Sequence, residues 1–165
     1  MPKHDYLLAL GSNVRHVHHG SPHDVIRAAM AALNGHGLKV RRMSPIIQTA
    51  PLGPSRRRFA NAAVLVCTEK EPPELLARLQ KIERKFGRKR IGSQWRARVL
   101  DIDIALWSGG AWASKGLIIP HIALRKRDFV LRPALSIAPD WRDPLTGLTI
   151  RHLTSRLTRH LRMPR

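Results

Sequence analysis

Two aspartates, Asp101 and Asp103, stand one residue apart in the run Val-Leu-Asp-Ile-Asp-Ile-Ala-Leu. They are the only acidic residues between Glu83 and Asp128, a stretch that is otherwise rich in lysine and arginine. In a β-strand, residues i and i+2 point to the same side, with Cα atoms about 6.5–7 Å apart. Two carboxylates held in this way suit Mg²⁺, which prefers carboxylate oxygens and completes its shell with water and substrate phosphates, and a pair of ions could share them. The alternative is that both aspartates neutralise arginines on a solvated strand face.

A basic segment, Arg-Lys-Arg-Ile-Gly-Ser-Gln-Trp-Arg-Ala-Arg over residues 88–98, comes directly before the aspartates. Phosphoryl transfer needs positive charge around crowded phosphate oxygens and little covalent help, and the arginine fork grips such oxygens. A solvated basic loop or a nucleic-acid patch is the alternative. The sequence has neither a Walker A motif nor a Gly-x-Gly-x-x-Gly motif, so neither a P-loop NTPase nor a Rossmann enzyme is supported.

The aspartates lie in a predicted strand over residues 99–107. Its alternation places Leu100, Ile102, Ile104 and Leu106 on one face, and Val99, Asp101, Asp103 and Ala105 on the other. The pattern predicts further strands over residues 5–10, 38–49 (bent near Pro45), 61–69 and 117–120, and helices over 24–33, 72–86 and 129–138, the last interrupted by Pro133. The order β-α-β-β-α-β predicts an α+β, ferredoxin-like fold, in which helices cover the faces of an antiparallel sheet.

Length and composition indicate one globular domain over residues 1–165, with 43% apolar and 25% charged residues. The single cysteine, Cys67, excludes a disulfide framework and a cysteine-based zinc site. Neither a membrane-spanning apolar run nor a signal peptide is present, so we expect a cytoplasmic protein. The formal net charge of +19 indicates a surface that attracts polyanions.

Two smaller features are further candidate sites. Asn61, at the start of a predicted strand, offers hydrogen-bond donors and acceptors to a second, ring-shaped ligand. The histidine cluster His16, His18 and His19 has no carboxylate close by in the sequence, which favours a solvated loop over a metal site.

Several segments together carry a resemblance to a known family. They are LALGSN (8–13), QTAPLGP (48–54), FANA (59–62), RVLDIDIAL (98–106), IPH (119–121) and RDFVLRPALSIAP (127–139). In this order they resemble the 6-hydroxymethyl-7,8-dihydropterin pyrophosphokinases of folate biosynthesis. The resemblance runs from about residue 6 to about residue 150. It implies an enzyme that transfers the β,γ-pyrophosphate of ATP to the hydroxymethyl group of the pterin and releases AMP.

The resemblance also implies a role for individual residues. Asp101 and Asp103 match the ligands of two Mg²⁺ ions, and Arg88 and Arg98 match the arginines that stabilise the moving phosphoryl charge. The positions that match ATP contacts are Gln80, Glu83, Arg90, Trp95, Ile104, His121 and Arg127. The positions that match pterin contacts are Thr49, Ala50, Leu52 and Asn61, with Phe59 and Phe129 as an aromatic sandwich. One departure is Ile122, which follows His121 where the family often has an aromatic residue with a hydroxyl.

The resemblance implies ATP and the hydroxymethylpterin as small-molecule substrates and a monomeric protein, with no nucleic acid or membrane as partner. The competing hypothesis is a small basic nucleic-acid-binding ferredoxin-like domain, which would present exposed aromatic residues on its strands. The acidic pair on the strand face disfavours it, because carboxylates repel a phosphate backbone. A catalytically inactive relative is a third reading, disfavoured by the intact Arg98, Asp101 and Asp103.

Overall fold

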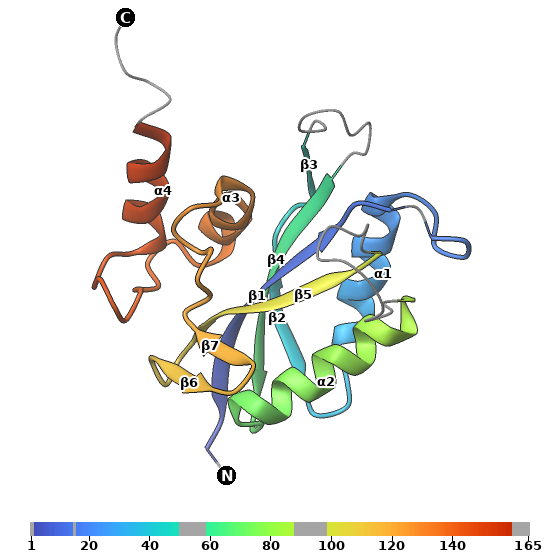
Figure 1. The fold of residues 1–165 in the computed structure, drawn as a ribbon, viewed down its shortest axis with the longest axis horizontal. Coiled ribbons are helices and arrows are strands. Elements are labelled where there is room, and N and C mark those ends of the chain that lie inside the picture. The colour runs from blue at the N-terminus through green and yellow to red at the C-terminus, as the bar shows by residue number, and fades with distance from the viewer. Residues whose placement is uncertain (1, 15, 50–58, 88–98, 160–165) are drawn as a thin grey trace, which may run out of the picture.

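A computed structural model of the chain describes residues 2–14, 16–49, 59–87 and 99–159. The elements, in chain order, are β1 (His4–Ser12), α1 (Pro22–Leu33), β2 (Lys39–Met43), β3 (Ile47–Thr49), β4 (Phe59–Thr68), α2 (Pro72–Lys85), β5 (Asp101–Trp107), β6 (Trp112–Ser114), β7 (Leu117–Ile119), α3 (Asp128–Ile137) and α4 (Ile150–Arg159) (Figure 1). Within these ranges, no helix is both long enough and apolar enough to cross a membrane.

The main sheet has the strand order β2-β4-β1-β5, and β3 pairs with β4 beside β2. Every pairing is antiparallel. The predicted bend near Pro45 is confirmed, because β2 and β3 both pair with β4 and are separated by three residues. Treated as one bent strand, they complete the βαββαβ order, so the predicted ferredoxin-like fold is confirmed.

Local sequence signals fix the start of both long helices. Ser21 caps α1: its hydroxyl accepts the Asp24 N–H, and the Asp24 carboxylate accepts the Ser21 N–H. Pro22 follows at the first helical position. In α2, Glu71 and Glu74 form the same reciprocal arrangement on either side of two prolines. Both helices begin and end within two residues of the predicted ranges, which are 24–33 and 72–86.

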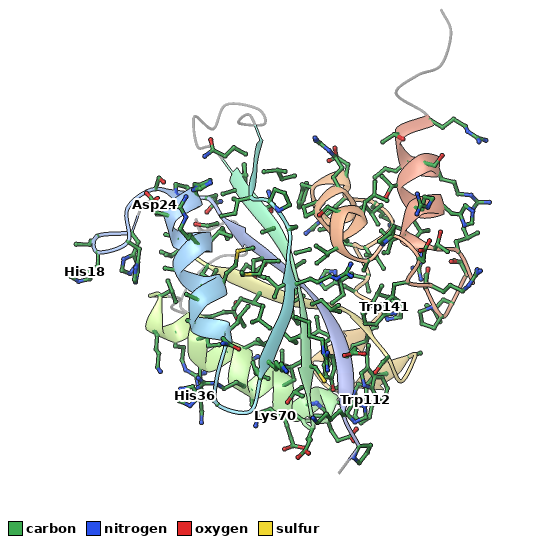
Figure 2. The ribbon with its side chains drawn as sticks, turned by 180° about the vertical axis from the view of Figure 1, so that it is seen from behind. His18, Asp24, His36, Lys70, Trp112 and Trp141 are labelled. Atoms are coloured by element: carbon green, nitrogen blue, oxygen red, sulfur yellow. The ribbon has the colours of Figure 1, made fainter. Side chains whose placement is uncertain are left out.

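Each face of the sheet packs against its own pair of helices. Buried residues of α1 and α2 form the larger core with one face, and α3 and α4 form a second core with the other (Figure 1). Figure 2 places Trp141, which packs against the second core, on the α3–α4 side. Strand β1 lies between the two cores, and its Leu7 and Leu8 are both fully buried.

A bulge changes the predicted faces of β5. Leu8 pairs with Ile104 but Leu7 pairs with Leu106, so Ala105 is the extra residue. Ala105 and Leu106 therefore both belong to the second core, and the prediction that Leu106 shares a face with Ile104 is wrong. Val99 lies before the strand and packs against the first core, so its predicted face is wrong as well. The alternation of residues 100–104 is confirmed.

Two other predictions need correction. Helix α3 continues through Pro133, so the predicted interruption is wrong. The proline costs a hydrogen bond and crowds the carbonyl four residues earlier, but Leu131, Ala134 and Ile137 on either side of it are buried in the second core and hold the helix in place. The hairpin of β6 and β7, of which the sequence predicted only the second strand, extends the fold beside β5.

Candidate active site

The two aspartates point to the same face of β5. Asp101 pairs with Gly11 of β1 and Asp103 pairs with Ala9, with no bulge between them. Both carboxylate-bearing residues are half-buried, and the intervening Ile102 is buried in the first core. The predicted side-by-side arrangement of the two carboxylates is therefore present on the sheet face that α3 partly covers.

Asn61 lies on the same face, two strands away. It pairs with Gly11 on the other side of β1 and is 8% exposed. A Cβ atom on Gly11 would lie 3.2 Å from the Asn61 Oδ1 atom. Asn61, Gly11 and Asp101 thus form one row of paired residues across three strands, and the Asn61 amide extends over Gly11 along this row. At about 4.8 Å between neighbouring strands, the Cα atoms of Asn61 and Asp101 lie about 10 Å apart.

The two predicted aromatic residues approach this face from different elements. Phe59 begins β4, two residues before Asn61, and is half-buried. Phe129 lies in the first turn of α3 and is also half-buried. The guanidinium carbon of Arg127 lies 5.6 Å from the centre of the Phe129 ring, within the range of a cation–π contact. A predicted ATP residue and a predicted pterin residue are thus in direct contact.

His121 is joined to β5 by its backbone and by its ring. Its N–H donates to the Ala105 carbonyl oxygen at 3.1 Å. Its Nδ1 atom accepts the Ala123 N–H at 3.1 Å, so the proton of the neutral ring resides on Nε2. Nε2 lies 3.8 Å from the Asp103 Oδ2 atom, and both side chains are about one-third exposed. The bulge at Ala105 therefore supplies the carbonyl that brings the histidine beside the metal-ligand candidate.

A cavity of about 290 Å³ follows the outer edge of β5 between α2 and the β6–β7 hairpin. Three of the predicted site residues line it: Asp103, Ile104 and His121. The other lining residues are Leu76, Ile102, Ser114, Gly116, Leu117, Ile118 and Ile122. Most of these were not predicted, although Gly116, which has a positive φ of 80°, is a turn signal that could have revealed the hairpin.

The two α2 residues predicted to contact ATP lie behind β5. Glu83 is 2% exposed, and its carboxylate accepts the Ile102 N–H at 3.3 Å. This bond holds the backbone between the two aspartates, which is a supporting role that the sequence did not suggest. Gln80 is half-buried one turn earlier. Neither residue lines the β5 cavity, so their contact with ATP stays a prediction.

The carboxylates at β5 suit a Mg²⁺ ion that is bound jointly by the protein and the substrate. Within the described ranges, no group of three or more His, Cys, Asp or Glu residues is arranged to hold a metal ion. An ion held by the protein alone is therefore not indicated there. Two adjacent carboxylates beside an open cavity suit an ion that keeps waters and takes its remaining oxygens from substrate phosphates.

Six predicted residues lie outside the described part of the chain: Ala50, Leu52, Arg88, Arg90, Trp95 and Arg98. Thr49 is the last residue of β3 and pairs with Phe59. Its backbone therefore lies beside the predicted pterin residues.

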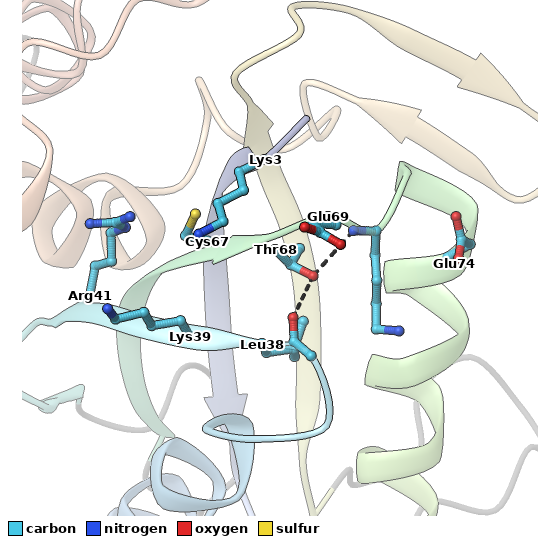
Figure 3. Close-up of a pocket in the computed structure, with 10 residues that line it drawn as sticks. Lys3, Leu38, Lys39, Arg41, Cys67, Thr68, Glu69 and Glu74 are labelled. Atoms are coloured by element: carbon cyan, nitrogen blue, oxygen red, sulfur yellow. Dashed lines mark hydrogen bonds between the residues drawn. The ribbon is translucent and has the colours of Figure 1, made fainter. Parts of the chain in front are cut away.

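A larger cavity, of about 470 Å³, lies at the opposite end of β4 (Figure 3). Cys67, Thr68 and Glu69 contribute to it, together with Lys39 and Arg41 of β2. A hydrogen bond with the Cys67 thiol is the main cause that raises the pKa of the Arg41 guanidinium. Seven residues of extended strand, or more than about 20 Å, separate Thr68 from Asn61. This cavity is therefore not part of the site around the aspartates.

Comparison with known proteins assigns the family. The family model for 7,8-dihydro-6-hydroxymethylpterin-pyrophosphokinase (HPPK) matches residues 7–139. A 2-amino-4-hydroxy-6-hydroxymethyldihydropteridine pyrophosphokinase of Synechocystis is 36% identical over 148 residues, which are 89% of this chain and 73% of that protein. The enzyme of the same name from Haemophilus influenzae is 34% identical over 81% of each chain.

Longer relatives contain a similar region. The chain matches 27% of the length of a folate synthesis bifunctional protein of Arabidopsis thaliana, at 35% identity. The crystal structure of wild-type Plasmodium falciparum HPPK-DHPS with STZ-DHP aligns with a TM-score of 0.75. That alignment covers 98% of this chain and 44% of the Plasmodium chain at 13% identity, so it supports the fold alone. On the family match and the two bacterial relatives, the chain belongs to the 7,8-dihydro-6-hydroxymethylpterin-pyrophosphokinase family.

Proposed function

We propose that this protein transfers the pyrophosphoryl group of ATP to the hydroxymethyl group of 6-hydroxymethyl-7,8-dihydropterin, giving AMP and the pterin diphosphate for folate synthesis. The observation that carries this proposal is the single sheet face that holds Asp101, Asp103 and Asn61, with the Asp103–His121 contact at its edge. Family membership supports the same reaction. The compartment that we propose for the reaction is the cytoplasm, where ATP is available.

The nucleotide occupies the cavity along the edge of β5. Ile102, Ile104 and Leu117 offer it an apolar wall. His121 lines the same cavity, and its Nε2–H donates a hydrogen bond to a phosphate oxygen. Asp101 and Asp103 would hold two Mg²⁺ ions, and such ions would neutralise triphosphate charge and polarise the phosphorus that is attacked.

The pterin lies on the sheet face beside Asn61. The amide supplies both a donor and an acceptor to the ring edge, while Phe59 and Phe129 offer their faces for stacking. The hydroxymethyl oxygen then forms a bond with the β-phosphorus as the bond from that phosphorus to the α–β bridging oxygen breaks. AMP leaves with the bridging oxygen, and the hydroxyl proton passes to solvent water. Because the two substrates meet directly, positioning contributes most of the rate and no protein nucleophile is needed.

The predicted arginines complete this proposal. Arg88 and Arg98 stabilise the charge on the moving group, and Arg90 and Trp95 contact ATP from the same segment. Arg127, held against the Phe129 ring, contacts ATP from the α3 side. Thr49, Ala50 and Leu52 contact the pterin. The chain acts as one domain and as a monomer.

The test is to incubate the protein with ATP, Mg²⁺ and reduced 6-hydroxymethylpterin and to identify the nucleotide product. AMP that forms only when the pterin is present supports the proposal. Formation of ADP, or of no nucleotide product, contradicts it. Asp103→Asn serves as the inactive control protein.

The nucleic-acid-binding alternative is not favoured by the sheet. The face away from α1 and α2 carries carboxylates at one end and packs against α3 and α4 at the other. A single-stranded nucleic acid would need that face open, with aromatic residues on it.

A further inference from the structure

The turn over residues 121–127 connects β7 to α3 and carries two predicted ATP residues, His121 and Arg127. Its first residue is joined to β5 by the bond between His121 N–H and the Ala105 carbonyl. Its centre is held by Leu124, which is fully buried in the second core and donates its N–H to the His121 carbonyl at 3.0 Å. The position of both ATP residues therefore depends on how this short turn is fixed.

Arg125 extends from the middle of the turn to Asp143, which lies 18 residues later in the α3–α4 connection. Its Nε atom donates to the Asp143 Oδ2 atom at 2.6 Å, and its Nη2 atom donates to Oδ1 at 2.9 Å. Such a two-bond fork fixes orientation as well as distance. Arg125 lies four residues after His121 and two before Arg127, so a shift at this point moves both.

Asp143 is a rigid anchor. It is 0% exposed, and its two oxygens also accept the Leu145 N–H and the Thr146 hydroxyl, each at 2.9 Å. Its own backbone bonds to Leu148 and Gly147, both at 2.8 Å, close the loop around it. Each carboxylate oxygen thus receives two hydrogen bonds, and a buried carboxylate of this kind tolerates little displacement of its partner.

We propose that Arg125 and Asp143 are a positioning pair that holds the 121–127 turn against the edge of β5, so that His121 and Arg127 face the triphosphate. This proposal rests on the proposed function. The pair adds to that function a structural role: it connects the nucleotide side of the site to the second core. Neither of the two residues lines the β5 cavity. A role in folding stability alone is the competing explanation.

The experiment compares wild type with Arg125→Met, Arg125→Lys and the double variant Arg125→Met/Asp143→Asn. The readouts are KM for ATP, KM for the pterin and kcat, together with long-range ¹H–¹⁵N spectra of the His121 ring in the protein without substrates. The control is Arg151→Met, which removes an exposed ion pair, Arg151 to Asp140 at 3.4 Å, from the same connection.

For Arg125→Met we expect the KM for ATP to rise about fivefold to fiftyfold, with kcat and the pterin KM changed less than about twofold and the His121 ring signals shifted. Arg125→Lys keeps the charge but not the fork, so it lies between Met and wild type. The double variant keeps the raised KM for ATP, because it removes the uncompensated Asp143 charge but does not restore the hydrogen bonds between positions 125 and 143. Arg151→Met behaves as wild type.

A lower melting temperature with unchanged KM and unchanged His121 signals overturns the proposal, as does recovery of the wild-type KM in the double variant. If Arg125→Met fails to fold, Arg125→Lys and the double variant decide by the same criteria. If wild type forms no AMP, the proposed function has failed, and the His121 spectra still test the positioning role.

Discussion

Asn61 and Asp101 occupy one row across three adjacent strands, with only the glycine Gly11 between them. The row connects the predicted pterin side of the site to the predicted metal side. Because Gly11 has no side chain, the row itself places no side chain between these two polar residues. In the proposed function, a flat ring that hydrogen-bonds to Asn61 extends along this row toward Asp101.

Gly11→Ala should disturb pterin binding and leave ATP binding intact. The new Cβ atom would lie 3.2 Å from the Asn61 Oδ1 atom, so the amide must move by a few tenths of an ångström. We expect the pterin KM to rise roughly threefold to tenfold, or about 1 kcal/mol, while the ATP KM stays within about twofold. Steady-state kinetics with each substrate varied in turn measures both. An equal rise in the two KM values would show that the glycine serves the sheet in general.

Much of the fold could be predicted because its signals are local. The two prolines that open α2 and the capping pair Ser21–Asp24 mark helix starts directly in the sequence. The β6–β7 hairpin could not be found from alternation, because strands of three residues are too short to show a period. The bulge at Ala105 was also invisible, since the apolar alternation runs on through Leu106 while the register with β1 changes.

The site was predictable to a different degree. The same-face placement of Asp101 and Asp103 follows from strand geometry alone. The assignment of Asn61 and Phe129 to one ligand needed the resemblance, because they lie on elements far apart in the chain. The contact between His121 and Asp103 depends on the bulge carbonyl that holds the histidine, and the burial of Glu83 behind β5 depends on tertiary packing. The spacing of residues along the sequence predicts neither the His121–Asp103 contact nor the burial of Glu83.

Asp101→Asn and Asp103→Asn should each lower kcat about a hundredfold or more, or roughly 3 kcal/mol of transition-state stabilisation, because an amide is a poor Mg²⁺ ligand. Neither side chain is fully buried, so both variants should fold normally. AMP formation over a range of Mg²⁺ concentrations and a thermal melt measure the two effects. Asp5→Asn, which alters an exposed carboxylate 4.0 Å from Arg41, is the matched control. Activity near wild type in both site variants would contradict the metal assignment.

The two nitrogens of His121 should be separable by substitution. An asparagine oxygen can occupy the place of Nδ1 and keep the bond to the Ala123 N–H, whereas a glutamine amide can occupy the place of Nε2. We expect His121→Asn to keep the melting temperature and to lose about tenfold or more in kcat/KM for ATP. His121→Gln should show the reverse, with a lower melting temperature and a smaller loss of activity. The opposite ranking would mean that Nδ1, and not Nε2, faces the nucleotide.

Asp143 should make the stability of the protein depend on acid. Burial alone would raise the pKa of its carboxyl group, but hydrogen bonds from Arg125, the Leu145 N–H and the Thr146 hydroxyl lower the pKa below the usual value of 3.8. The unfolded chain therefore takes up this proton first as the pH falls. The stabilising contribution is complete well above the unfolded pKa and is lost as the pH falls through that value toward the folded pKa.

Urea unfolding of wild type and Asp143→Asn between pH 7 and pH 3 measures this contribution. Wild type should be the more stable protein at pH 7, and the difference in free energy of unfolding should shrink steadily below about pH 4. The asparagine cannot take up the proton, so the variant's curve is the shallower of the two. The prediction rests on the four hydrogen bonds that the fully buried Asp143 carboxylate accepts. Parallel curves would contradict it, because they would mean that Asp143 ionises alike in the folded and the unfolded chain.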